Sequence, residues 1–203
     1  FYDTVSAAAK YLQKNAPVRS RRVIVALTDG EDNWSDLTRE AEKANYRDID
    51  VNSLTPEKRN QLAARTDAAH LQAQAQILRD LQNADSVFYV INPAGDSYKL
   101  NKISKRAQIG LERFSVDTGG TAFLPKFLST NMKDPLLNGI NSKRNEETLD
   151  RIFKQLTGEL RAQYLIQYYS DADFPVNKYV KLDVGLQNSG GLRLRSRQGY
   201  YVK

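Results

Sequence analysis

The sequence predicts an α/β protein in which helices flank a mostly parallel sheet and an antiparallel hairpin follows at the C-terminus. Two continuous apolar runs, 23–27 within the expected strand 22–28 and 87–91, are rich in β-branched or aromatic residues and are too short for buried helices. Segments with helical periodicity separate them, which is the alternation of βαβ units. Near the C-terminus, apolar and polar residues alternate, which is typical of antiparallel strands with one face in water.

Length and composition fit one globular domain. The chain has 203 residues, which is enough for one core and a small appendage. It contains no cysteine, which excludes disulfides, thiolate metal sites and a cysteine nucleophile. No apolar run is long enough to span a membrane. The net charge of +6 is spread along the chain, so nucleic acid is not a favoured partner.

The first elements lead to a polar segment. A helix carrying Val5, Ala9 and Leu12 on one face is predicted to end before Pro17. The run 22–28 follows as a strand buried on both faces, as in a parallel sheet covered by helices. Residues 36–65 are polar and charged, so we predict an irregular segment inserted into the domain there.

A long helix and a second strand come next. Thr55-Pro56-Glu57 combines a hydroxyl cap, a proline at the first helical position and an acidic first turn. An apolar face then predicts a helix of about 25 residues, longer than average. His70 lies in a polar part of it, and we expect its side chain to be exposed. The run 87–91 is the second parallel strand.

The second half is predicted to change from helices to strands. The expected elements are a helix from Ile103 to Phe114, a short strand at 121–124, a loop across the sheet edge over 125–143 and a helix from Asn145. Beyond them we expect a strand at 164–169, with its tyrosines as packing residues, and a hairpin that turns at 188–191. We therefore divide the chain into residues 1–162, an α/β part, and residues 163–203, which pack on or extend it.

Oxygen-bearing side chains gather directly after the first strand. Asp29 lies at its carboxyl end, where open α/β sheets bind ligands, and Glu31, Asp32 and Asn33 follow. Asn92, after the second strand, is expected at the rim of the same site. Such oxygens suit a hard divalent cation. A turn that only caps the next helix explains the first of these residues equally well.

Several segments together resemble a von Willebrand factor type A (VWA) domain, and more closely the bacterial subgroup of such domains described from acidobacteria. The matching segments are Phe1–Asp3, Arg22–Asn33, Val87–Ile91, Asp117–Phe123, Glu159–Tyr164 and Arg195–Tyr200. The likeness spans nearly the whole chain apart from 36–65. It implies a Rossmann-like, doubly wound sheet.

The resemblance also implies a metal-ion-dependent adhesion site (MIDAS) at the top of the sheet. In the family, Mg²⁺, Mn²⁺ or Ca²⁺ is held by an Asp-x-Ser-x-Ser loop, a threonine and a third-loop aspartate, and a partner protein adds an acidic side chain. Asp29 is similar by position to that aspartate. The other two motifs are absent from this sequence. The site is therefore expected to be complete only with an N-terminal segment not in this chain, and the chain as given holds too few ligands for tight binding.

The family's strand order gives a second expectation. Its first strand lies beside the strand 22–28, so here that strand would present a bare edge. We expect an N-terminal segment or a second copy to pair beside it. The chain starts at Phe1, without methionine and inside a predicted helix, which favours an upstream segment.

The leading hypothesis is a protein-binding module without enzymatic activity, which the resemblance places outside the cytoplasm, secreted or periplasmic. One alternative is an Mg²⁺-dependent phosphoryl-transfer or hydrolytic enzyme, because an aspartate after a parallel strand also serves that chemistry. Another is a polyanion-binding module, because Arg193, Arg195 and Arg197 recur at every second position of the expected last strand. A solvated strand face explains the same arginines and is the favoured interpretation.

Overall fold

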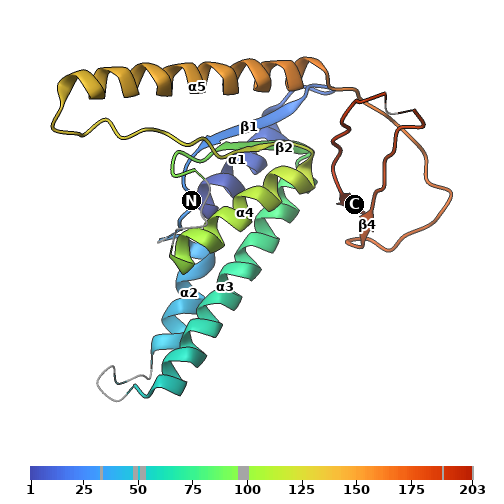
Figure 1. Ribbon diagram of the computed structural model, residues 1–203. Coiled ribbons are helices and arrows are strands. Elements are labelled where there is room, and N and C mark those ends of the chain that lie inside the picture. The colour runs from blue at the N-terminus through green and yellow to red at the C-terminus, as the bar shows by residue number, and fades with distance from the viewer. Residues whose placement is uncertain (33, 48–49, 51–53, 96–100, 189, 203) are drawn as a thin grey trace.

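The computed structural model describes residues 1–32, 34–47, 50, 54–95, 101–188 and 190–202. Helices and strands alternate through most of the chain (Figure 1). Their order is α1 (Tyr2–Asn15), β1 (Arg22–Leu27), α2 (Asp36–Tyr46), α3 (Pro56–Asn83), β2 (Ser86–Ile91), α4 (Lys102–Thr118), β3 (Ala122–Phe123), α5 (Pro135–Arg161), β4 (Tyr179–Lys181) and β5 (Gly199–Tyr201).

A parallel sheet of three strands, in the order β1-β2-β3, organises the fold. β1 pairs with β2 from Arg22 opposite Ser86 to Leu27 opposite Ile91. β3 adds to the other side of β2, with Phe123 opposite Ile91. The carboxyl ends of all three strands therefore meet at one edge of the sheet. The mixed α/β architecture and this sheet agree with the predicted class.

Helices cover both faces of the sheet. On one face, Phe88 and Val90 pack into a core with side chains of α1, α3 and α4, including Ile77, Leu111 and Phe114. On the other face, the core comprises Tyr89, Ile91, Phe123, Ile152 and Leu156, the last two from α5. Figure 1 shows α5 lying across the strands on the side opposite to α1, α3 and α4.

β1 is less buried than its sequence predicts. Ile24 and Ala26 face the larger core, but the exposed fractions of Val25 and Leu27, on the other face, are 45% and 69%. Among the described residues β1 pairs only with β2, so it is an edge strand. The prediction of a strand buried on both faces was therefore wrong, because the core beneath α5 centres on β2 and β3.

Two segments predicted as loops are helical. Within 36–65, α2 forms a complete helix and α3 begins at Pro56, where the Thr55 side chain accepts a hydrogen bond from Lys58 N–H as predicted. α5 begins at Pro135, ten residues before the predicted start, because the Asp134 side chain caps it. Both loop predictions failed because a polar composition does not prevent helix formation where good helix formers are present, and at α5 a side-chain cap adds to this.

The C-terminal strands are shorter than predicted. Residues 164–169 form no regular strand, and the exposed fractions of Tyr164, Tyr168 and Tyr169 are 90%, 51% and 90%, which corrects their predicted packing role. β4 and β5 pair antiparallel from Tyr179 opposite Tyr201 to Lys181 opposite Gly199, a register centred on the predicted turn. Within the described ranges, residues 182–184 and 192–195 on the two sides of the predicted turn do not pair with each other, and Leu182 N–H donates instead to Gln198 C=O at 2.9 Å. Within the described part of the chain, no helix is long and apolar enough to cross a bilayer.

Candidate functional site at the carboxyl edge of the sheet

The loop after β1 holds Asp29 at the carboxyl edge of the sheet. Thr28 N–H donates to Ile91 C=O at 3.1 Å, so the sheet pairing continues one residue beyond β1. Asp29 Oδ1 accepts from Glu31 N–H at 3.1 Å, which is an Asx turn. Oδ2 accepts no hydrogen bond from the described residues, and Asp29 is exposed. The predicted placement at the sheet edge is confirmed, and one carboxylate oxygen remains available to a ligand.

Gly30 lets the loop turn back onto α4. Its φ is +77°, and a Cβ added there would lie 2.6 Å from Leu111 Cγ. Leu111 is fully buried in the core, so an added Cβ would force its side chain to shift among closely packed neighbours. Only glycine combines this backbone conformation with so close an approach. The contact fixes the direction in which the loop leaves the sheet, and with it the place of Asp29.

Asp32 joins the starts of two helices. Its Oδ1 accepts from the Phe1 amino group at 2.9 Å and from Tyr2 N–H at 3.1 Å, while Oδ2 accepts from Ser35 Oγ at 2.6 Å and Thr38 Oγ1 at 3.1 Å. Burial raises the pKa of Asp32, but the bonds from Ser35, the Phe1 amino group and Tyr2 outweigh it, so the pKa lies below its ordinary value. This carboxylate is ionised and fully engaged. It is a structural group rather than the free rim ligand that the sequence predicted.

The other predicted rim residues are also engaged. Glu31 Oε1 accepts a short hydrogen bond from Ser104 Oγ at the start of α4. Asn92 is buried, its N–H donates to Phe123 C=O at 2.9 Å, and its Oδ1 accepts from Ala94 N–H at 2.9 Å. Asn33 lies outside the described residues. Asn92 therefore shapes the loop after β2 beside Asp29 instead of presenting a free oxygen.

The described residues alone do not fit a complete divalent-cation site. Magnesium and calcium prefer six or more oxygen ligands, several of them from the protein or a bound substrate. In the described part of the chain no three histidine, aspartate or glutamate side chains gather closely enough to hold a metal ion. Asp29 offers one free oxygen, whereas Asp32 and Glu31 are engaged by hydrogen-bond donors. A cation at this edge needs ligands from elsewhere.

His70 is buried, which contradicts the predicted exposed position. Only 3% of its surface is exposed, because α2 packs against α3 and covers it. Nε2 lies 3.2 Å from Glu42 Oε1, and Nδ1 has no partner among the described residues. Burial lowers the pKa of His70, Arg106 lowers it further, and Glu42 opposes both without reversing the shift. No local pattern in the sequence indicates this environment, since the covering helix was itself predicted as a loop.

The C-terminal arginines differ in their partners. Arg195 Nη1 lies 2.6 Å from Glu159 Oε1, and Arg197 Nη1 lies 2.7 Å from Asp85 Oδ1. Arg193 is exposed and has no ion pair within the described ranges. Two of the three charges predicted to contact a polyanion are therefore balanced by carboxylates, which weakens the field that such a ligand would feel.

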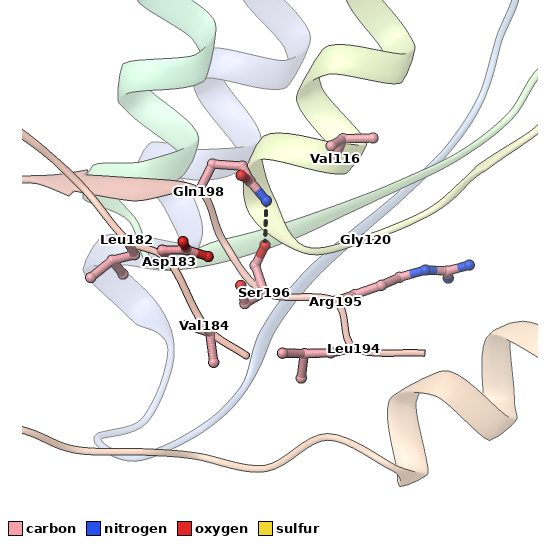
Figure 2. A pocket seen from close by; sticks show the side chains of 9 residues that line it. All are labelled: Val116, Gly120, Leu182, Asp183, Val184, Leu194, Arg195, Ser196 and Gln198. Carbon is pink, nitrogen blue, oxygen red and sulfur yellow. Dashed lines mark hydrogen bonds between the residues drawn. The ribbon is translucent and has the colours of Figure 1, made fainter. Parts of the chain in front are cut away.

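A cavity of about 310 Å³ lies between the C-terminal hairpin and the end of α4 (Figure 2). Its lining is mixed, with apolar side chains and a few polar ones: Val116, Leu182, Asp183, Val184, Leu194, Ser196 and Gln198, besides Gly120 and Arg195. Figure 2 shows the Arg195 side chain directed away from the other lining side chains. Asp29 does not line this cavity.

Comparison of the chain with protein-family models, with curated proteins and with solved structures finds no match. The function is therefore inferred from the residues of this chain and their geometry.

Proposed function

We propose that this protein is a protein-binding module and that the carboxyl edge of its sheet, at Asp29, meets the partner. The observation that supports this proposal is the state of Asp29, an exposed carboxylate with one unengaged oxygen at the end of a parallel strand. Ligands of open α/β sheets bind at this edge. The neighbouring polar groups, Glu31, Asp32 and Asn92, already have intramolecular partners, so Asp29 is the group left for an intermolecular contact.

A divalent cation enters the proposal only as a shared ion. Asp29 supplies one carboxylate oxygen, and the other ligands come from an acidic side chain of the partner and from a further polypeptide segment. The unpaired edge of β1 offers a place for such a segment, either N-terminal to this chain or in a second copy, because its backbone groups have no strand beside them on that side within the described ranges.

The finer fold assignment belongs to the same proposal. A Rossmann-like, doubly wound VWA domain is consistent with the parallel sheet, with helices on both of its faces and with Asp29 after an apolar strand. An extracytoplasmic location is the corresponding expectation. The enzymatic and polyanion-binding alternatives have no specific observation in their favour.

Peptide selection tests the proposed contact and needs no purified partner. A random peptide library displayed on phage is selected on the full-length protein with Mg²⁺ present, after depletion on the Asp29→Ala variant of the same protein. We expect the selected peptides to carry an acidic residue and to lose binding in EDTA. Asp150→Ala, which removes an exposed carboxylate from α5, is the matched control and should keep full binding.

Selected peptides that bind Asp29→Ala as tightly as the wild type would refute the proposed surface. Peptides that need Asp29 but bind equally in EDTA would leave the surface in place and eliminate the shared ion.

A further inference from the structure

The N-terminal half of α5 extends beyond the sheet, and a single extended segment of the chain runs along it. The buried residues of α5 are Asn141, Ile152 and Leu156, and only the last two reach the sheet core. Residues 124–134 connect β3 to α5 without regular structure. Figure 1 shows this connection running back along the helix to its first residue.

Three asparagines of α5, which we call the asparagine clamp, hold this segment. Asn145 Oδ1 accepts from Leu128 N–H at 2.8 Å, and its Nδ2 donates to Leu128 C=O at 2.9 Å. Asn138 Oδ1 accepts from Met132 N–H at 2.9 Å, and its Nδ2 donates to Met132 C=O at 2.8 Å. Asn141 Nδ2 donates to the carbonyl of the intervening Ser129 at 2.8 Å.

All five of these bonds go to the main chain of the segment. A carboxamide carries the same donor and acceptor as a peptide group, so a bidentate asparagine takes the place of a neighbouring strand. Positions 138, 141 and 145 lie on one helix face because they are three and four residues apart. The side chains of Leu128 and Met132 stay 39% and 45% exposed. The clamp therefore holds the segment mainly through its backbone, with one weak contact to a side chain, from Asn141 Nδ2 to Met132 Sδ at 3.9 Å.

We propose that the asparagine clamp is a binding site for an extended peptide of a partner protein, and that residues 126–133 occupy it in cis until that peptide replaces them. The kind of ligand follows from the segment that now occupies the clamp. That segment contacts the asparagines through backbone N–H and C=O groups, which an extended peptide offers at every residue other than proline. Recognition of this kind, through main-chain bonds, is the basis of strand addition to sheet edges. The site does not include Asp29 and does not depend on a cation.

The cis segment competes with any added peptide because its tether gives it an effective concentration in the millimolar range. A test therefore needs a variant in which residues 126–133 no longer occupy the clamp, which we call the vacated variant. Leu128→Pro with Met132→Pro removes the two N–H groups that Asn145 and Asn138 accept. The probe is a fluorescent peptide with the sequence of residues 126–133, and its binding is followed by fluorescence anisotropy.

We expect the peptide to bind the vacated variant at least about tenfold more tightly than the wild type, because the five clamp bonds are then made to the peptide. Adding Asn138→Ala and Asn145→Ala to the vacated variant should abolish the gain. Ser142→Ala, an exposed change on the same helix, should preserve it. A scrambled peptide of the same composition should bind comparably.

Two results would overturn the proposal, provided that circular dichroism shows native helix content in every variant. One is equal peptide binding by wild-type, vacated and asparagine-free proteins, or no binding by any of them. The other is strong preference for the native over the scrambled peptide, which would mean that side chains are recognised. Neither result bears on Asp29, so the two proposed surfaces are tested separately.

Discussion

The different states of Asp29 and Asp32 lead to a direct test by substitution. Asp32→Ala removes a buried carboxylate that accepts hydrogen bonds from Tyr2 N–H, Ser35 Oγ and Thr38 Oγ1 as well as from the chain's first amino group. Asp29→Ala removes an exposed carboxylate that accepts one hydrogen bond from the described residues, from Glu31 N–H. We expect a large loss of stability in the first variant and almost none in the second.

The magnitude follows from the donors that lose their acceptor. Bonds to a charged group contribute about 1.5–3 kcal/mol each, and a helix cap about 1 kcal/mol. Ser35 Oγ and Thr38 Oγ1 lie 3.0 Å apart and can form a hydrogen bond to each other. This bond partly offsets the loss of their hydrogen bonds to Asp32. Tyr2 N–H has no such substitute. We therefore expect Asp32→Ala to lower the free energy of unfolding by about 3 kcal/mol, and Asp29→Ala by less than about 0.5 kcal/mol, as for an ordinary surface change.

Urea denaturation followed by circular dichroism measures both values, provided that the slope of the transition is unchanged. Asp32→Asn provides an intermediate comparison. Because asparagine keeps one acceptor oxygen, the free energy of unfolding of this variant should lie between those of the wild type and the alanine variant. A loss below about 1 kcal/mol for Asp32→Ala would refute the structural role assigned to this carboxylate. A comparable loss for Asp29→Ala would refute the view that Asp29 is free for binding.

Two further predictions concern groups near these loops. His70 is the only histidine, so its ring resonance in NMR is unambiguous, and it should titrate below the ordinary value of 6.5. The contribution of His70 to the free energy of unfolding is then complete above pH 6.5 and is lost as the pH falls through the folded-state pKa. If the pH dependence of the free energy of unfolding is the same in His70→Gln as in the wild type across that range, this prediction is wrong. Gly30→Ala should lower the free energy of unfolding, measured by urea denaturation, by about 2–4 kcal/mol, because alanine would have to adopt a positive φ and its Cβ would collide with Leu111. A loss below about 1 kcal/mol would contradict the close approach of the Gly30 backbone to Leu111.

The sheet and its longest predicted helix were predictable because local signals and tertiary structure agree there. The runs that became β1 and β2 are apolar, β-branched and bounded by polar turns, and the start of α3 at Thr55-Pro56 has both a cap and a proline. The place of Asp29 followed from strand direction alone, since parallel strands end at one edge. No long-range contact was needed for these predictions.

The failures have a common physical cause, which is burial supplied by elements distant in sequence. Asp32 differs from Asp29 because the start of α1, some thirty residues away, and the side chains of Ser35 and Thr38 at the start of α2 all donate to it. His70 lies in a polar stretch, but α2 covers it. The early start of α5 is a different case, because Asp134-Pro135 carries the same start signal as Thr55-Pro56, and the helix tolerates Gly139 in its interior.

The two proposed surfaces are connected through the sheet. Parallel strands release their loops at one edge, so Asp29 after β1, Asn92 after β2 and the clamped segment after β3 all start there. The connection is tight, because Asn92 N–H donates to Phe123 C=O at 2.9 Å and a Cβ on Gly95 would lie 2.7 Å from Pro125 C=O. Release of the clamped segment would thus begin beside the loop that follows β2. A partner that binds the edge at Asp29 is therefore well placed to supply the extended peptide that replaces residues 126–133, and the two contacts would then add through a shared tether.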